Sequence, residues 1–475
     1  MTVSTISTDQ SAVRELREFP GLEDIAIVYP DDPGYDEARI AWNLAIDQRP
    51  AAVASPTNAC EVVRIVRAAR ILGLQVAPQS TGHNAGPLAA QSLDDVIILR
   101  TGALDEIRVD PERKTVRVGG GVVWKPAVDA AAAHGLSVLH GSAVDVGIAG
   151  YTLGGGLGWY SRSLGMAANS LVAVELVTGA GEFLRADATH HTDLFWAVRG
   201  GGGNFGIVTA MEFRAYDFST AYAGLMMWDI SEAPRVLDAW RRWAPDAPDE
   251  VTTSLRIMRI PPIPEVPEPV RGRSIVVIDG AVLADDDQAA RIIEPLRALG
   301  PEMDTFGRMP SEVLVHLHMD PEEPGPGHVT STMLRTLDDA AAAALLEAVG
   351  PGVETPLMIV ELRQLGGAVG RPHEGGGVLS HLDGEFALVC GGMAPTPEFA
   401  SVVAAAGAQV VERMSPWTNG RNYLNFAEDP TDVRAGYPED AWLRLATIRS
   451  AVDPDGVLVA NHRIPRLYEH GEATG

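Results

Sequence analysis

The chain has 475 residues, of which 46% are hydrophobic and 21% charged, and its formal net charge is −26. This length exceeds that of one ordinary domain and predicts two. The strong negative charge argues against nucleic acid and against an anionic membrane surface as partners, because both bind basic protein faces.

The first 215 residues alternate predicted strands and helices. Asn58 followed by Glu61 predicts a helix start, and Gly73 predicts the end of that helix. Strands are expected at 51–55, 74–78, 96–100, 107–110, 115–120 and 205–216, a hairpin at 171–186, and further helices at 124–135 and 193–200. This region forms the first predicted domain.

After residue 216, predicted strands come in pairs between single helices. Strands are expected at 221–230, 251–260, 274–284, 330–335, 357–365 and 384–392, and helices at 232–243, 285–300 and 338–350. This order favours an antiparallel sheet covered on one face by helices, an α+β fold. A helix at 440–451 is expected in a C-terminal segment that returns to the first domain. The predicted division is 1–215, 216–420 and 421–475.

Three glycine-rich stretches lie in the first predicted domain. They are PQSTGHNAGPLA (78–89), which contains His83, YTLGGGLG (151–158) and GGGG (200–203). Tight turns with positive φ would explain each run. A large ligand that the backbone approaches closely would explain all three, and exposed N–H groups in such loops suit a pyrophosphate. GGGLG fits the G-x-G-x-x-G fingerprint poorly, so a nicotinamide cofactor is not predicted.

The sequence shows no metal site and no hydrolase motif. His316 and His318 would share one face of a predicted strand, but two ligands do not make a metal site. We interpret them as a half-exposed polar face. No G-x-S-x-G elbow and no cysteine with a catalytic signature is present.

Compartment is predicted from the cysteines and the N-terminus. Cys60 and Cys390 lie far apart in sequence and do not indicate a disulfide framework. The first residues lack a secretory pattern, and no apolar run reaches the roughly 20 residues of a membrane helix. We therefore expect a soluble, cytoplasmic protein.

Four motifs follow one another in a recognisable order. They are QSTGHNAG (79–86), LHGSAVDVGIAGYTLGGGLGWYSRSLGM (139–166), DLFWAVRGGGGNFGIVT (193–209), and YLNF (423–426) with NHRIP (461–465). Together they resemble the berberine bridge enzyme-like oxidases of the vanillyl-alcohol oxidase and p-cresol methylhydroxylase (PCMH) flavoprotein superfamily. The resemblance covers nearly the whole chain, although residues 216–420 match only in character. It implies a PCMH-type FAD-binding domain joined to a substrate domain.

The resemblance also implies how FAD is held. The matching histidine, His83, is expected to be joined covalently to the 8α-methyl carbon of FAD. A second link in many members comes from a cysteine whose position here falls on Ala143, so a single link is expected. Gln79 and Asn169 replace a usual arginine and aspartate. The other expected FAD contacts are Gln79, Ser80, Thr81, Gly82, Asn84, Gly86, Ser142, Val146, Gly147, Gly150, Tyr151, Gly155, Gly156, Val208, Asn425 and Asn461.

The catalytic base is not fixed by the resemblance. Phe426 stands where several plant members have a tyrosine base. Strand alternation puts Glu361 and Arg363 on one face, so Glu361 is the first candidate base and Arg363 a candidate anchor for an anionic or carbonyl group. An ion pair exposed to solvent is the alternative. Tyr423 and His381 are further candidates.

The resemblance implies an FAD-dependent oxidoreductase. The expected reaction is hydride transfer to flavin N5 from a small or medium organic substrate, an alcohol or a biosynthetic intermediate, with O2 as acceptor, in secondary metabolism. Dehydrogenation, cyclisation or flavin-oxygen chemistry on a natural product is one alternative. A flavin-binding protein without turnover is another.

Overall fold

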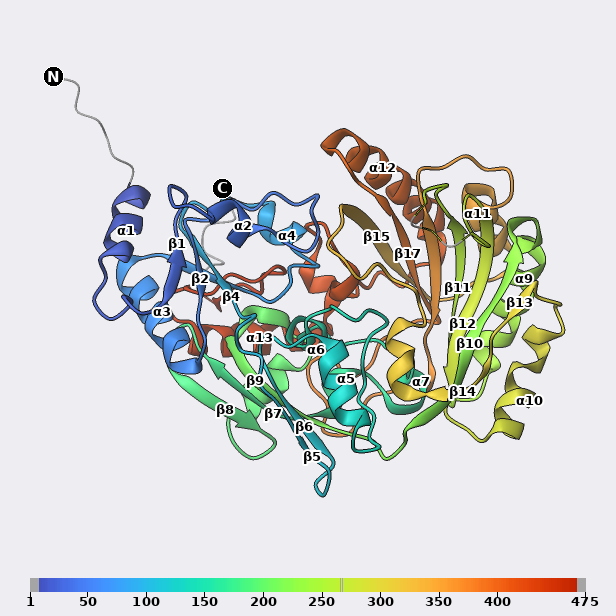
Figure 1. Ribbon diagram of the computed structural model, residues 1–475, viewed down its shortest axis with the longest axis horizontal. Coiled ribbons are helices and arrows are strands. Elements are labelled where there is room, and N and C mark those ends of the chain that lie inside the picture. Colours follow the sequence, from blue (N-terminus) through green and yellow to red (C-terminus); the bar gives the residue numbers. More distant parts are fainter. Residues whose placement is uncertain (1–7, 265, 267, 468–475) are drawn as a thin grey trace.

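The computed structural model describes residues 8–264, 266 and 268–467, and three sheets organise this part of the chain (Figure 1). Two sheets come from the first half of the sequence and lie on the left of Figure 1. The third comes from residues 220–393 and lies on the right. The loops that matter for function lie where the two sides meet.

The first sheet has the strand order β1-β2-β4-β3. Its strands are β1 (Ala26–Val28), β2 (Ala52–Ser55), β3 (Gln75–Gln79) and β4 (Val96–Arg100), accompanied by α1 (Thr8–Arg17), α2 (Tyr35–Arg39), α3 (Ala59–Leu72) and α4 (Gly86–Ala89). The predicted helix caps are confirmed. The Asn58 side chain accepts the N–H of Glu61, and Gly73 ends α3 at φ 70°. Because β3 runs parallel to β4, the histidine loop that follows β3 lies at the end of the sheet where both strands have their carboxyl ends.

The second sheet has the strand order β5-β6-β9-β7-β8 and is antiparallel. Its strands are β5 (Ile107–Asp110), β6 (Thr115–Gly119), β7 (Leu171–Val177), β8 (Phe183–Asp187) and β9 (Ile207–Arg214), accompanied by α5 (Trp124–Ala132), α6 (Ile148–Leu153), α7 (Ser161–Leu164) and α8 (Thr192–Val198). The predicted hairpin at 171–186 is confirmed as β7 and β8.

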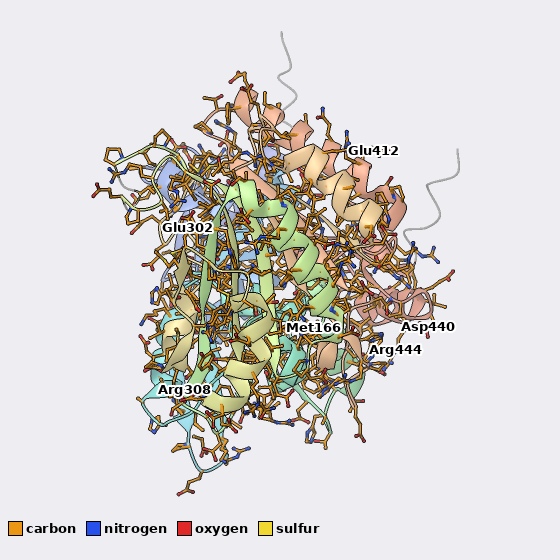
Figure 2. All side chains as sticks on the ribbon, turned by 90° about the vertical axis from the view of Figure 1, so that its right-hand side faces the viewer. Met166, Glu302, Arg308, Glu412, Asp440 and Arg444 are labelled. Atoms are coloured by element: carbon orange, nitrogen blue, oxygen red, sulfur yellow. The ribbon has the colours of Figure 1, made fainter. Side chains whose placement is uncertain are left out.

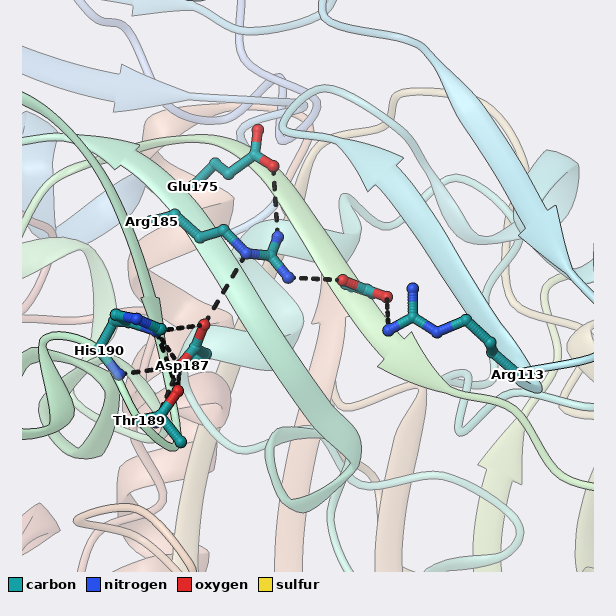
Figure 3. Close-up of polar contacts among 7 residues, drawn as sticks. Arg113, Glu175, Arg185, Asp187, Thr189 and His190 are labelled. Atoms are coloured by element: carbon teal, nitrogen blue, oxygen red, sulfur yellow. Dashed lines mark hydrogen bonds and ion pairs between the residues drawn. The ribbon is translucent and has the colours of Figure 1, made fainter.

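Charged side chains cover part of this sheet's outer surface. Arg185 pairs with Glu175, as Figure 3 shows. Its Nη2 also lies 2.9 Å from Oε2 of Glu212. Arg113 lies 3.8 Å from the same Glu212 carboxylate, and Asp187 accepts hydrogen bonds from Thr189 and His190. The arginines of these pairs are exposed, but the Glu175 and Glu212 side chains are only 19% and 10% exposed, so the pairs are partly buried.

The third sheet has the order β13-β10-β12-β11-β16-β17-β15, with β14 on β10, and every described pair is antiparallel. Its strands are β10 (Thr220–Asp229), β11 (Val251–Arg259), β12 (Ser274–Val282), β13 (Met303–Asp304), β14 (Gly307–Pro310), β15 (Gly327–Leu334), β16 (Ile359–Gln364) and β17 (Phe386–Met393). The predicted antiparallel sheet is therefore confirmed.

Helices cover one face of the third sheet. They are α9 (Ala233–Trp243), α10 (Asp286–Arg297), α11 (Asp339–Val349) and α12 (Pro397–Met414). The core between helices and sheet contains the buried Trp228, Trp240 and Phe386. Figure 2 looks onto this end of the molecule, where the helices lie in front of the strands and α12 carries Glu412. The other face of the sheet is turned toward the first half of the chain.

The C-terminal segment packs against the first half of the chain. Helix α13 (Trp442–Val452) shares a buried core with α8, and Arg444 lies 2.6 Å from Asp193. After α13, Val459 donates to the carbonyl of Val76 in β3, and Val76 donates to Val457. This pairing places residues 457–462 beside the histidine loop.

The expectation of a strand carrying His316 and His318 is wrong. Residues 311–316 form a 3₁₀ helix, and Leu314 and Val315 are buried as neighbours, which a strand facing one core would not allow. Residues 424–426 form another 3₁₀ helix, because Phe426 donates to the carbonyl of Tyr423.

Candidate functional site

A cavity of about 520 Å³ lies where the loops of the first two sheets meet the third sheet. It is lined by the histidine loop, by residues from the other two glycine-rich stretches, by β15, β16 and β17, and by residues 423–426, 428 and 459–462. Most predicted site residues line it, namely Gln79, Ser80, Thr81, Gly82, His83, Asn84, Ser142, Val146, Gly147, Gly150, Tyr151, Val208, Arg363, Tyr423, Asn425 and Asn461. Gly86, Gly155, Gly156, Glu361 and His381 do not line it.

The ring of His83 is fixed by three neighbours. Trp42 stacks on it with ring centroids 4.0 Å apart. Thr81 Oγ1 shares a hydrogen bond of 2.8 Å with His83 Nδ1, and Asp145 Oδ1 lies 3.4 Å from His83 Nε2. Trp42 also donates its indole N–H to Asp145. Nothing in the local sequence marks Trp42 as a site residue, because only tertiary packing brings residue 42 to the loop, whereas Asp145 lies within the motif at 139–166.

The histidine loop offers free backbone donors. Gly82 has φ +86°, and an added Cβ would stand 2.9 Å from the Cβ of Ala41, so only glycine fits this turn. Within the described part of the chain, the N–H groups of Thr81, Gly82, His83 and Asn84 donate to no protein atom. Such a run of unpaired amides suits a pyrophosphate.

Side chains from residues 423–425 form hydrogen bonds with the backbone of the second glycine stretch. The Tyr423 hydroxyl accepts the N–H of Gly156 at 2.9 Å, and Asn425 Nδ2 donates to the carbonyl of Tyr151 at 2.8 Å. This explains why Gly156 lies behind the cavity wall. Burial raises the pKa of Tyr423 to about 12, so its hydroxyl is protonated at neutral pH.

Gly154 provides a test of this wall. A Cβ at residue 154 would stand 1.8 Å from Oδ1 of Asn425. We expect G154A to displace Asn425, to lower the free energy of unfolding by about 1–3 kcal/mol and to reduce bound ligand. Thermal unfolding and ligand content measure this. Gly102→Ala is the control, since nothing lies within 4 Å of its added Cβ; equal effects of the two variants would contradict the contact.

Glu361 and Arg363 extend from the sheet face opposite the helices, as strand alternation predicts. Val360 and Leu362 lie in the helix-covered core, whereas Arg363 Nε donates to Glu361 Oε1 at 2.7 Å. The alternative of a solvent-exposed pair is wrong, because Glu361 is only 3% exposed. Arg363 alone of the two reaches the cavity, where it lies 5.1 Å from the ring centre of Phe426.

His318 is buried between two carboxylates, so its interpretation as part of a half-exposed face is wrong. Its Nδ1 lies 2.9 Å from Asp279 Oδ2, and its Nε2 lies 3.5 Å from Glu361 Oε1. Both ring nitrogens therefore face acceptors, as in the charged imidazolium. Burial and Arg256 oppose this charge, but Asp279 and its neighbouring carboxylates raise the pKa of His318 to about 9.

The charge of Glu361 follows from the same cluster. Burial opposes its ionisation, yet Arg363 and His318 overcome that penalty and hold the pKa of Glu361 well below its usual range. A carboxylate held in this way is a weak base. His381 lies outside the cavity, 3.6 Å from Asp383, and the neighbouring Ser380 carbonyl accepts from Asn169.

The cavity fits a flavin dinucleotide. Bare glycine backbone lines it at residues 147, 150, 154, 200, 202, 203 and 206, so a flat ligand can approach closely. The free amides of the histidine loop suit its pyrophosphate. Oδ1 of Asn84 is buried without a hydrogen-bond partner among the described residues, which leaves an acceptor for a ligand N–H or O–H. The part of the chain that the structure describes contains no helix able to cross a membrane and no group of three or more potential metal ligands.

Sequence comparison places an FAD-binding domain in the chain. Residues 50–187 match the family model described as "FAD binding domain". (R)-6-hydroxynicotine oxidase of Paenarthrobacter nicotinovorans is 34% identical over 214 residues, 44% of this chain and 46% of that protein. Glucooligosaccharide oxidase of Sarocladium strictum is 28% identical over 224 residues, 46% of this chain and 45% of that protein. The chain thus spans about half the length of the curated relatives it matches.

Solved structures resemble nearly the whole chain. The 6-hydroxy-D-nicotine oxidase from Arthrobacter nicotinovorans aligns with a TM-score of 0.77 at 25% identity, covering 93% of this chain and 98% of that one. A BBE-like protein of Physcomitrella patens aligns with a TM-score of 0.81 at 20% identity, covering 97% and 99%, which shows the fold. The predicted α+β flavoprotein fold with its PCMH-type FAD-binding domain is confirmed. The chain thus contains an FAD-binding domain and is similar to FAD-linked oxidases, among them the 6-hydroxynicotine oxidases.

Proposed function

We propose that the protein is an FAD-dependent oxidoreductase that oxidises a small or medium organic molecule, with His83 as the covalent attachment point of the flavin. The observation that carries this proposal is the shared cavity. The fixed ring of His83 lines the same space as Arg363 of β16 and Val389 of β17, so a cofactor held at the loop meets the sheet that faces it. When bound, FAD supplies the two-electron acceptor for such an oxidation.

A single covalent link is supported by the positions of the cysteines. Ala143 lines the cavity at the place where a second link would require a cysteine. Cys60 is exposed on α3, and Cys390 is buried in the core under the helices of the third sheet. Burial raises the pKa of Cys390 to about 12, so it stays an unreactive thiol.

The sheet side of the cavity supports an uncharged or weakly polar substrate. Val329, Val389 and Phe426 give it apolar walls, and Arg363 gives it one fixed cation. The Arg363 guanidinium can donate to the oxygen of an alcohol as that oxygen becomes a carbonyl. The proposed electron acceptor is O2, which fits relatives that are named oxidases. The proposed role is in secondary metabolism, and the proposed location is the cytoplasm.

The proposed function is tested on the purified protein without knowledge of its substrate. Its visible spectrum is recorded, and the protein is then mixed under anaerobic conditions with a panel of primary alcohols, secondary alcohols and amines. Bleaching of the flavin by a panel member, followed by recovery of the colour in air, is the expected result. A colourless protein would refute FAD binding. A yellow protein that no panel member bleaches would favour a flavin-binding protein without turnover.

A further inference from the structure

Glu428 lies on a segment that crosses the cavity between the histidine loop and the third sheet. Asn84 Nδ2 donates to the carbonyl of Leu424 at 3.3 Å, on the loop side. Ser331 Oγ of β15 donates to the carbonyl of Phe426 at 2.7 Å, on the sheet side. The backbone of Glu428 packs closely on Gly86: a Cβ added to residue 86 would stand 2.2 Å from the Glu428 carbonyl oxygen. The segment is therefore fixed at both sides.

The carboxylate of Glu428 is held by one oxygen and free at the other. Oε2 accepts the N–H of Val329 at 3.1 Å. Oε1 has no hydrogen-bond or ion-pair partner among the described residues. The side chain lines the cavity beside Val329, Val389 and Phe426. A proton acceptor needs this combination of a fixed carboxylate and an unoccupied oxygen.

The surroundings of Glu428 set its charge. Burial raises the pKa of Glu428 to about 7; His328 of β15 opposes the rise and Asp429 supports it. His328 and Asp429 lie 3.3 Å apart and largely neutralise each other. The other titratable side chains lining the cavity are His83, His462, Tyr151, Tyr423, Tyr437, Asp320 and Arg363. A base poised near the working pH is the most effective kind.

We propose that Glu428 is the proton acceptor in the oxidation, an inference that rests on the proposed function. Glu428 Oε1 takes the proton of a substrate O–H or N–H bond. The electron pair of that bond becomes the second bond of the new C=O or C=N group. The adjacent C–H bond breaks, and its hydrogen leaves with both electrons to the bound FAD. One proton on Glu428 and one hydride, a hydrogen with two electrons, taken up by FAD account for both hydrogens and both electrons that the substrate loses.

Other candidate bases are less suited to the role. Glu361 is paired with Arg363 and His318 and does not line the cavity, so it is a positioning residue for Arg363. Tyr423 already accepts two hydrogen bonds and keeps its proton. Asp320 lines the cavity, but its negative charge stabilises the Arg363 guanidinium, and taking up a proton would remove that interaction. Phe426 has no ionisable group.

The first test needs no substrate. Infrared spectra of the holoenzyme are recorded across neutral pH, and the carbonyl band of a protonated carboxyl group is followed. We expect a band that disappears as pH rises through about 7 and that is missing in E428Q. A band that persists unchanged in E428Q would overturn the assignment of this titration to Glu428.

The second test follows flavin reduction, using the alcohol or amine that bleaches the native flavin fastest. For the wild type, the rate should rise with pH through about 7, because only the ionised carboxylate accepts a proton. E428Q should retain its flavin and lose about a hundredfold or more in this rate on the alkaline side. Equal rates in E428Q and the wild type would overturn the proposal while leaving the oxidoreductase function intact, whereas a colourless wild type would instead refute the function.

Two neighbouring variants sharpen the test. Asp429→Asn removes a negative charge beside Glu428 and frees His328, so the midpoint of the pH profile should fall. His328→Gln removes the positive charge, so the midpoint should rise. The plateau rate should change little in either variant. Midpoints that move together, or not at all, would contradict Glu428 as the titrating base.

Discussion

The H83A variant should release its yellow colour into the supernatant when it is precipitated with acid, whereas the wild-type pellet stays yellow. The physical reason is the proposed covalent bond at His83, which survives unfolding when every non-covalent contact is lost. The ring lies 3.4 Å from Asp145 and stacks on Trp42, so the tether is held in a single orientation before attachment. The visible spectra of pellet and supernatant measure the outcome.

His462 offers a matched control. It also lines the cavity, but its Nε2 donates to the carbonyl of Leu424 at 3.1 Å, and it belongs to none of the contacts that fix the loop. We expect H462A to keep its colour in the pellet. Colour released from H462A but retained by H83A would move the attachment to His462. Colour released by the wild type would leave FAD bound without a covalent bond.

Part of the site can be predicted from the sequence alone. His83 and the glycines of the cavity wall stand in contiguous motifs, because a turn or a close backbone approach imposes its demand on neighbouring residues. Most of them accordingly line the cavity. Strand alternation also placed Glu361 and Arg363 on one face correctly.

Tertiary contacts account for what the sequence did not reveal. Trp42 reaches His83 from the turn after α2, and nothing local marks it as a site residue. His318 and Asp279 come together from a loop and from β12, so their pairing follows only from the packing of the third sheet on the first half of the chain. Nothing in the sequence distinguishes Glu428 from other glutamates, because its raised pKa results from burial in the folded protein. At 311–316 the sequence pattern predicted a strand where a 3₁₀ helix formed.

D279N should lower the free energy of unfolding by about 3–5 kcal/mol, because it leaves the buried Arg256 guanidinium without its counter-charge. Asp279 is fully buried and accepts from Ser254 Oγ, from His318 and from Arg256, which is 1% exposed. Urea unfolding at neutral pH measures the change. Glu347→Gln is the control: it removes one charge from an exposed pair with Arg413 and should cost under about 1 kcal/mol.

His318 belongs to the same cluster as Asp279, and we expect its protonation to make the stability depend on pH. Its pKa is raised from 6.5 to about 9, so the folded state binds the proton more tightly than the unfolded state. That contribution to stability is fully present below about pH 6.5 and is lost as pH rises through about 9. In H318Q, the free energy of unfolding should therefore decrease less than in the wild type between about pH 6.5 and about pH 9.

H318Q should also cost less than D279N at neutral pH. Removing the imidazolium leaves Arg256 with Asp279 and Arg363 with Glu361, so two oppositely charged pairs remain. Removing the Asp279 carboxylate instead leaves Arg256 and His318 facing each other as like charges. If H318Q proved the more damaging variant, or if the wild type kept a level stability above pH 6.5, His318 would be neutral in the folded protein. Arg363 would then owe its position to Glu361 alone.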